Sequence, residues 1–231
     1  MLRLLLLSDT HLGLGEHHFA AYERALAFAR DADLVVHAGD VFYRSRVKPG
    51  LVFRAFDPLK RIADGGVPVF VVPGNHERSA IPFPLLAMHP RIHIFDHPRT
   101  FHLNVKGAEV AISGFPCVRN GIRDLFPQLE PRGDIRLLTL HQSVEGATVG
   151  PVNFTFRDGP DVLPRRAIPR HFHAVLAGHI HRHQVLDANA PVFYPGATEP
   201  TSSAEWGERK GCVTLELGSE GVRSWRFHAL Q

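Results

Sequence analysis

Short apolar runs that end in glycine, aspartate, asparagine, serine or histidine recur along the chain and constrain its fold more than any other feature. Each run has the length of a buried strand, and the polar residues stand at or just after its carboxyl end. The runs are Leu4–Ser8, Leu34–His37, Val67–Val72, Val110–Gly114, Ile135–His141 and Val175–Gly178. The pattern predicts a sheet-based fold in which polar side chains gather at the strand ends.

Two segments between the first three runs have apolar residues at helical spacing. These segments are Phe19–Arg30 and Pro49–Ala63. The first half therefore reads strand, helix, strand, helix, strand, and the handedness of such crossovers predicts a parallel sheet. Pro58 lies inside the second helix, where a missing N–H is unfavourable, so we expect a kink or a break after Asp57.

The second half of the chain has shorter expected strands. Thr100–Val105 and Val192–Tyr194 are two of them, and Val213–Leu217 and Val222–His228 are joined by a short turn that predicts a hairpin. A mixed or second sheet follows, covered by helices on its outer side. The connection Gln142–Phe172 is rich in proline and glycine, and it reads as a long loop of the kind that is usually functional.

Composition excludes several classes of protein. Of the 231 residues, 44% are hydrophobic and 21% are charged, which is globular usage and favours one domain over 1–231. The early apolar run Leu2–Leu7 is too short for a membrane span or a signal peptide, so we expect a cytoplasmic protein without a membrane partner. Cys117 and Cys212 are too few for a disulfide framework.

The chain contains 16 histidines, which directs attention to metal chemistry. Polar side chains able to bind a metal follow several of the predicted strands, and the carboxyl edge of such a sheet is where ligands bind. They are Asp9, His11, Asp40, Asn75, His141, His179 and His181. Seven ligands are too many for one tetrahedral ion, but they suit two ions that share a carboxylate.

The many imidazoles favour two divalent transition-metal ions, Mn, Fe, Co, Ni or Zn, over Mg or Ca. Two such ions and two aspartates leave a site charge of about +2, which attracts a phosphate and stabilises its transition state. The expected nucleophile at neutral pH is a hydroxide that bridges the ions. The sequence therefore predicts in-line hydrolysis of a phosphoester.

The same motifs, in the same order, resemble the calcineurin-like metallophosphoesterase superfamily. They are Asp9-x-His11, Gly39-Asp40, Gly74-Asn75-His76-Glu77, His141 and Gly178-His179-x-His181. The resemblance implies an α/β fold with a two-layer mixed β sandwich flanked by helices, in the order α/β/β/α, and a binuclear centre with Mn²⁺ as the expected metal. By matching positions, one ion takes Asp9, His11, Asp40 and His181, and the other takes Asp40, Asn75, His141 and His179. Asp40 is then the bridge, and His76 is the group that contacts the phosphate and acts as a general acid.

Within the superfamily, the chain most resembles the SbcD-type DNA repair nucleases. The closest stretches are Ser8–Gly13, Gly39–Phe42, Pro68–Ser79 and Tyr194–Glu199. The resemblance implies DNA as substrate, allows a homodimer, and implies an SbcC-type ATPase partner. Two features depart from the family: Tyr43 stands where some members carry a further histidine, and the given sequence contains neither the capping domain nor the ATPase-docking segment of the full-length members.

Basic residues near the motifs suit a polyanionic substrate. Arg44, Arg46 and Arg78 are the predicted substrate-binding residues, against the alternative of a solvated surface. Phe154 and Phe156 either stack on bases or anchor their loop. His37 is interpreted as a packing residue or as one that orients a metal ligand.

Three functions remain open on the sequence alone. The leading hypothesis is a metal-dependent phosphodiesterase that acts on DNA. The alternative enzyme is a phosphoesterase for a nucleotide or cyclic nucleotide, favoured by the short chain. The third is a non-catalytic scaffold with the same fold, against which the complete ligand set argues.

Overall fold

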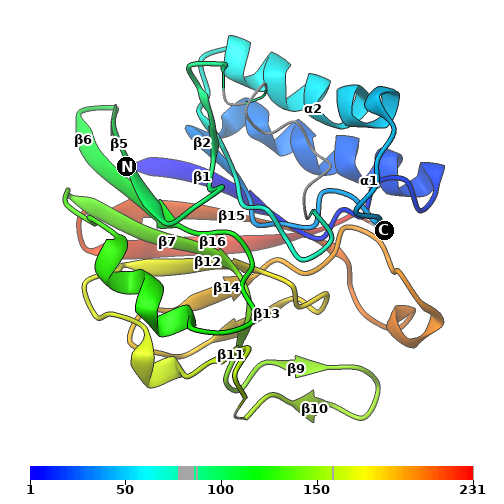
Figure 1. The fold of residues 1–231 in the computed structure, drawn as a ribbon. Helices are drawn as coiled ribbons and strands as arrows, with labels where there is room; N and C mark the ends of the chain where they lie inside the picture. The colour runs from blue at the N-terminus through cyan, green and yellow to red at the C-terminus, as the bar shows by residue number, and fades with distance from the viewer. Residues whose placement is uncertain (78–85, 87, 158, 231) are drawn as a thin grey trace.

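The computed structural model describes residues 1–77, 86, 88–157 and 159–230, which form two six-stranded sheets. The strand orders are β16-β15-β1-β2-β3-β4 and β13-β14-β12-β7-β6-β5. The sheets pack face to face, with α1 and α2 on the outer side of the first sheet (Figure 1). This arrangement confirms the predicted two-layer mixed β sandwich.

The first sheet is parallel in its centre and antiparallel at one side. Strands β1 to β4 run parallel, β15 pairs antiparallel with β1, and β15 and β16 form the predicted hairpin. The elements are β1 (Leu2–Leu7), β2 (Leu34–His37), β3 (Val69–Val71), β4 (Ile92–Ile94), β15 (Gly211–Gly218), β16 (Gly221–Ala229), α1 (Glu16–Leu26), η1 (Ala27–Asp31) and α2 (Pro49–Asp64). Tyr22, Phe56 and Leu59 are buried between the helices and this sheet, because each helix has one apolar face.

The second sheet has a parallel centre and two antiparallel edge strands. Its strands are β5 (Arg99–Val105), β6 (Ala108–Gly114), β7 (Ile135–His141), β12 (Ala174–Gly178), β13 (Gln184–Leu186) and β14 (Val192–Tyr194). Its outer core includes residues of the 3-10 helix η2 (Ile122–Gln128) and of the chain beside η3 (Arg165–Ala167). In the described part of the chain, the fourth layer is thus made of 3-10 helices and loops.

The interior between the sheets is apolar from both sides. Leu4, Leu6 and Phe70 of the first sheet pack with Leu137 and Leu176 of the second, and all five are buried. Because both inner faces are apolar, the two sheets are held in a fixed relation to each other. The strand ends of the two sheets are thereby also fixed relative to each other.

Of the kink or break expected at Pro58, the break is wrong. Helix α2 continues through Pro58 from Pro49 to Asp64. A proline inside a helix costs about 3 kcal/mol because one backbone hydrogen bond is lost. Val52, Phe56 and Leu59 are buried on the face toward the sheet, and their packing offsets that cost.

The connection from Gln142 to Phe172 is not a structureless loop. It contains β8 (Ser143–Val144), which pairs in parallel with β11 (Val162–Leu163). It also contains the hairpin of β9 (Thr148–Val149) and β10 (Phe154–Thr155), which projects from the end of the molecule (Figure 1). Short ladders therefore satisfy part of the backbone hydrogen bonding of this connection.

Among the described residues, no helix combines the length and the apolar character that crossing a lipid bilayer requires. The parallel strands β1, β2 and β3 share one direction in the first sheet, and β7 and β12 share one in the second. The carboxyl ends of each set thus lie at one edge of their sheet, and contacts between the following residues show that the two edges adjoin.

Candidate metal centre

All seven predicted metal ligands come together at this edge. Asp9 and His11 follow β1, Asp40 follows β2, Asn75 follows β3, and His141 ends β7. His179 and His181 follow β12. Three sets of side chains each bring one carboxylate or imidazole atom per residue to within 4.8 Å of the others in the set. The sets are Asp9, His11 and His181; His11, Asp40 and His76; and Asp9, Asp40 and His141.

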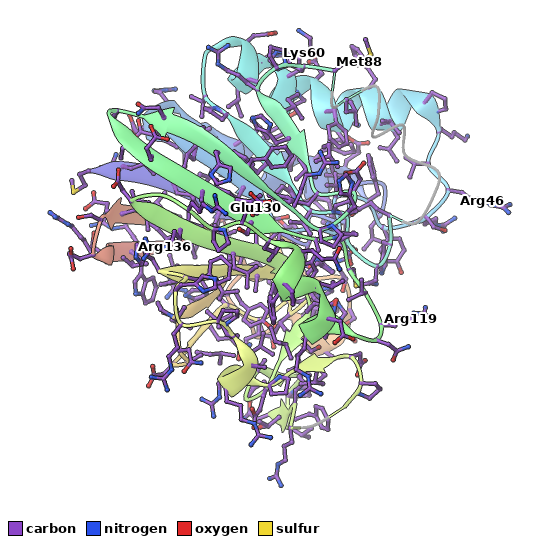
Figure 2. All side chains as sticks on the ribbon, turned by 60° about the vertical axis from the view of Figure 1, so that its left-hand side comes forward. Arg46, Lys60, Met88, Arg119, Glu130 and Arg136 are labelled. Carbon is purple, nitrogen blue, oxygen red and sulfur yellow. The ribbon has the colours of Figure 1, made fainter. Side chains whose placement is uncertain are left out.

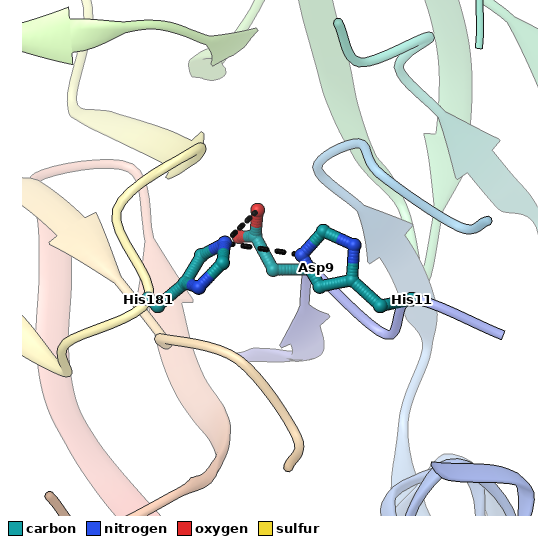
Figure 3. A group of neighbouring side chains, drawn as sticks. All are labelled: Asp9, His11 and His181. Carbon is teal, nitrogen blue, oxygen red and sulfur yellow. Dashed lines mark hydrogen bonds and ion pairs between the residues drawn. The ribbon is translucent and has the colours of Figure 1, made fainter. Parts of the chain in front are cut away.

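The first part of the centre joins the end of β1 to the loop after β12 (Figure 3). The Nε2 atoms of His11 and His181 are 3.0 Å apart, and Nε2 of His181 is 3.7 Å from Oδ1 of Asp9. Nδ1 of His11 is buried and has no hydrogen-bond partner in the described part of the chain. Two imidazole nitrogens facing each other beside a carboxylate fit a cation that accepts both lone pairs.

The second part of the centre is arranged around Asn75. Its Oδ1 lies 3.1 Å from Nε2 of His141 and 2.9 Å from Nδ1 of His179. Nδ1 of His141 is 2.8 Å from the carbonyl oxygen of Ala38 and donates to it, which directs the Nε2 lone pair into the site. Nε2 of His141 is also 3.4 Å from Oδ2 of Asp40, so Asp40 adjoins both parts.

The backbone is strained where the ligands stand. Asp9, His11, Asp40 and His179 have φ values of 51°, 45°, 52° and 89°, and they are four of the six non-glycine residues with positive φ in the described chain. Each such residue costs about 1 kcal/mol or more, so this conformation persists only where the surroundings impose it. Strain of this kind concentrates at functional sites.

Two glycines of the motifs are required by close approach. Gly39 has a φ of 102°, and a Cβ there would collide with the ring of His141. A Cβ on Gly74 would collide with the carboxylate of Asp40. Both positions therefore need glycine for the ligands to reach their places.

Glu77 holds the loops that carry the ligands Asp40 and Asn75, a role that the sequence motif did not reveal. Its buried carboxylate accepts hydrogen bonds from the backbone N–H groups of Gly74 (2.7 Å), Phe42 (2.8 Å) and Asp40 (3.1 Å). Burial and the charge of Asp40 raise the pKa of Glu77 to about 8, while these donors act in the opposite direction. Glu77 thus ties the loop after β2 to the loop after β3.

The electrostatics of the histidines differ within the centre. Burial and the neighbouring histidines lower the pKa of His11 to about 3 and that of His179 to about 4, so both are neutral at pH 7 with a lone pair available. Burial also opposes protonation of His141, but the charges of Asp40 and Asp9 outweigh it and raise its pKa to about 9. The two carboxylates thus favour positive charge at the place where His141 meets Asp40.

His76 lies at the open side of the centre. Its Nδ1 donates to the carbonyl oxygen of Tyr43, and its Nε2 is 3.8 Å from Oδ2 of Asp40. The side chain is 31% exposed, unlike those of Asp40 and His141, which are buried. His76 is thus placed to meet a molecule that enters from solvent.

Further polar contacts surround the ligands. Thr10 donates to the carbonyl oxygen of Val41, and Nε2 of His37, 3.0 Å away, donates to the Thr10 hydroxyl. Because Thr10 lies between Asp9 and His11, this contact agrees with the orienting interpretation of His37. The sequence did not reveal Glu205, whose carboxylate is 3.0 Å from Nδ1 of His181, because a separation of 24 residues carries no periodic signal.

Two of the three predicted substrate-binding residues, Arg44 and Arg46, lie outside the centre. Arg44 and Arg46 are exposed in the loop after Asp40, and neither makes a hydrogen bond or ion pair with a residue that the structure describes. Arg46 projects into solvent (Figure 2). Arg78 lies outside the described residues, so its predicted role stays a prediction.

The donor set fits divalent transition metals. It combines carboxylates, imidazoles and an amide oxygen, and the buried Nδ1 of His11 has no described partner. A model of the family described as calcineurin-like phosphoesterase matches residues 2–183. The chain belongs to this family. It is therefore a hydrolase that acts on phosphoester bonds and depends on metal.

Several curated proteins are similar to this chain. The DNA double-strand break repair protein Mre11 of Saccharolobus solfataricus is 27% identical over 198 residues, which cover 78% of this chain and 50% of that protein. The Mre11 protein of Methanosarcina mazei is also 27% identical, over 244 residues that cover 96% of this chain and 37% of that protein. This chain thus spans half or less of the length of these relatives.

A solved structure supports the fold. The crystal structure of a dimetal phosphatase from Danio rerio matches with a TM-score of 0.58 and 12% identity, over 98% of this chain and 99% of that one. At this identity the likeness shows the fold alone. It agrees with the sandwich of two mixed sheets described above.

Proposed function

We propose that the chain is a two-metal phosphodiesterase that cleaves DNA. The observation that supports this most is the convergence of seven metal-binding side chains, from five strand ends, into two adjoining groups. We assign one ion to Asp9, His11, Asp40 and His181, and the other to Asp40, Asn75, His141 and His179. Asp40 is the proposed bridge, since it adjoins both parts of the centre.

When bound, the two ions supply Lewis-acid stabilisation of the phosphate and a nucleophile at neutral pH. The protein supplies the position of the ligands, because strand ends and strained loops leave them little freedom. Asp9, Asp40 and His141 are buried, so little water surrounds them, which strengthens electrostatic interactions at the site. Mn²⁺ is the metal we propose, and it suits this mixed oxygen and nitrogen set.

His76 is the proposed general acid. The hydrogen bond from its Nδ1 to the carbonyl oxygen of Tyr43 fixes the ring, and Nε2 is the atom that faces the site. In the imidazolium form, Nε2 can give a proton to the leaving oxygen while Nδ1 keeps its hydrogen bond. His76 needs no metal contact for this role.

DNA is the proposed substrate because the similar curated proteins are named as DNA double-strand break repair proteins. The exposed Arg44 and Arg46 add positive charge close to Asp40 in sequence, and their side chains have no partner in the described chain that would compete with a phosphate. A strand of DNA presents phosphates at regular spacing and so can contact both the centre and the arginines.

The experiment removes metal from the protein, restores Mn²⁺ and adds end-labelled DNA at low salt. We expect Mn²⁺-dependent shortening of the DNA by the wild-type protein and not by Asp40→Asn, while Asp31→Asn, at an exposed position outside the centre, keeps its activity. A small chromogenic phosphodiester is assayed in parallel. Turnover of that compound with intact DNA would indicate a small-molecule phosphoesterase, and metal binding without turnover of either would indicate a scaffold.

A further inference from the structure

A carboxylate outside the region matched by the family model contacts the metal centre. Glu205 lies in η4 (Ser203–Glu205), beyond residue 183, where the match ends. Its Oε1 is 3.0 Å from Nδ1 of His181, and its side chain is 13% exposed. The segment that carries it follows β14 and is drawn in orange at the right of Figure 1.

The two nitrogens of the His181 ring have different neighbours. Nε2 points at Nε2 of His11 and at Oδ1 of Asp9, whereas Nδ1 points at Glu205 (Figure 3 shows the first of these contacts). A neutral imidazole has one N–H and one lone pair. If Nδ1 donates to Glu205, the lone pair of Nε2 is directed at the position of the ion.

Glu205 is itself held by several donors. Lys210 is fully buried, and its Nζ is 2.7 Å from Oε2 of Glu205, 2.9 Å from Oε2 of Glu208 and 2.9 Å from the carbonyl oxygen of His181. The hydroxyl of Thr201 donates to Oε1 of Glu205 at 2.7 Å. All three N–H groups of the ammonium are thereby used, so Oε2 of Glu205 cannot turn away without leaving a buried charge short of a partner.

We propose that Glu205 is a positioning residue of the metal centre, which sets the tautomer and the direction of the His181 ring. The proposal rests on the two-ion centre proposed above. The ion held by Asp9, His11 and His181 depends on Glu205. Among the described residues, Asn75, His141 and His179 make no hydrogen bond to Glu205, so the ion they would hold should not depend on it.

The surroundings of Glu205 make the isosteric variant more harmful than the truncated one. In Glu205→Gln the amide oxygen must face Lys210, which can only donate, so the NH₂ group faces Nδ1 of His181. Nδ1 then accepts, the ring proton moves to Nε2, and the lone pair for the ion is lost. In Glu205→Ala, Nδ1 keeps its proton and can donate to the hydroxyl of Thr201, 3.3 Å away.

The test is calorimetric titration of Mn²⁺ into the metal-free full chain. We expect two ions in the wild-type protein, with the dissociation constant of one ion raised about tenfold in Glu205→Ala and about 100-fold in Glu205→Gln. The other ion should bind as in the wild type. The matched control is Glu199→Gln, a carboxylate of the same segment that pairs with Arg24 at 3.4 Å instead of with the centre.

A second measurement does not depend on metal. Nitrogen-15 NMR of the metal-free proteins, at a pH high enough for the His181 ring to be neutral, should show its proton on Nδ1 in the wild type and on Nε2 in Glu205→Gln. If Glu205 had a merely structural role, Glu205→Ala, which leaves the larger cavity, would be at least as harmful as Glu205→Gln. Both ions would then bind more weakly, and the melting temperature would fall with their affinity. This result would overturn the proposal. If the wild-type protein takes up no Mn²⁺, both the two-ion centre and the role of Glu205 are overturned. If it takes up two ions but the His181 tautomer is unchanged in Glu205→Gln, the role of Glu205 alone is overturned.

Discussion

The metal centre differs in burial and contacts from the exposed residues that we call the rim, namely Arg44, Arg46 and the hairpin of β9 and β10. In the centre, Asp9, Asp40 and His141 are buried, and the ligands contact one another or backbone groups. On the rim, Arg44 and Arg46 are exposed and have no hydrogen-bond partner among the described residues. The hairpin of β9 and β10 is also exposed, with Val152 at 85% and Phe154 at 58%.

The difference indicates how the two regions divide the work. A buried and strained centre has one geometry, which suits a chemical step that tolerates little misplacement. An exposed rim with free side chains can adapt to a long and flexible substrate, and each of its contacts is worth little. Changes in the centre should therefore reduce turnover of every substrate, whereas changes on the rim should act on DNA alone.

The largest expected effect comes from His76→Ala. Loss of a general acid should reduce turnover of DNA by about 10²- to 10⁴-fold, while the protein keeps its bound Mn²⁺ because His76 is not a proposed ligand. Turnover and metal content are measured on the same sample, with the exposed His102→Ala as control. Loss of metal in His76→Ala would show that His76 is a metal ligand and not a group that lies outside the ligand set.

The next effect concerns the buried support of the centre. Burial and the neighbouring His141 lower the pKa of His37 from 6.5 to about 3, so the unfolded chain binds a proton below pH 6.5 that the folded chain does not bind. The contribution of His37 to stability is thus complete above pH 6.5 and is lost as the pH falls. Between pH 8 and pH 5 this loss amounts to about 2 kcal/mol of the free energy of unfolding.

Replacement of His37 by Asn should remove this part of the pH dependence. The measurement is urea unfolding of the metal-free protein at both pH values, for the wild type, His37→Asn and the exposed His102→Asn. The free energy of unfolding should decrease less between pH 8 and pH 5 in His37→Asn than in the wild type, and it should decrease as in the wild type in His102→Asn. An unchanged decrease in His37→Asn would show that His37 is protonated in the folded protein.

The smallest expected effect comes from the rim. Arg44→Gln combined with Arg46→Gln should raise the KM for DNA several-fold and reduce the salt slope of binding by about two, since each lost phosphate contact removes about one. The kcat for a small phosphodiester should not change. Arg30→Gln, exposed on η1 (Ala27–Asp31), is the matched control. An equal loss with the small substrate would place these arginines in the centre.

The sequence predicted the convergence of the candidate ligands better than the contacts that hold them in place. Asp9, Asp40 and His141 could be found because each stands at or just after the end of an apolar run, and parallel strands bring their carboxyl ends to one edge. Glu77 and Glu205 could not be found, because what they do depends on which N–H groups lie near them in the folded chain. Such contacts between distant segments leave no periodic pattern.

Two errors of local structure have a related cause. Local rules weigh Pro58 by its missing N–H, but the buried face of α2 decides the outcome through its packing with the sheet. The same rules interpreted the segment from Gln142 to Phe172 as a loop, but β8 and β11 pair there through residues that are 19 positions apart in the sequence. In both places tertiary packing overrides the propensity of the local sequence.

The position of β1 has a consequence for the order of events during synthesis. This strand is made before the other strands of its sheet, yet it lies in the middle of the sheet, between β2 and β15, and Leu4 pairs with Leu215. At about 5–20 residues per second, ribosomes need roughly 10–40 s to deliver its last partner. During that time one edge of β1 stays open to pairing with other chains, and Glu205 arrives only shortly before β15 closes it. The first sheet can therefore be completed only after Glu205 and every residue of the candidate metal centre have been made.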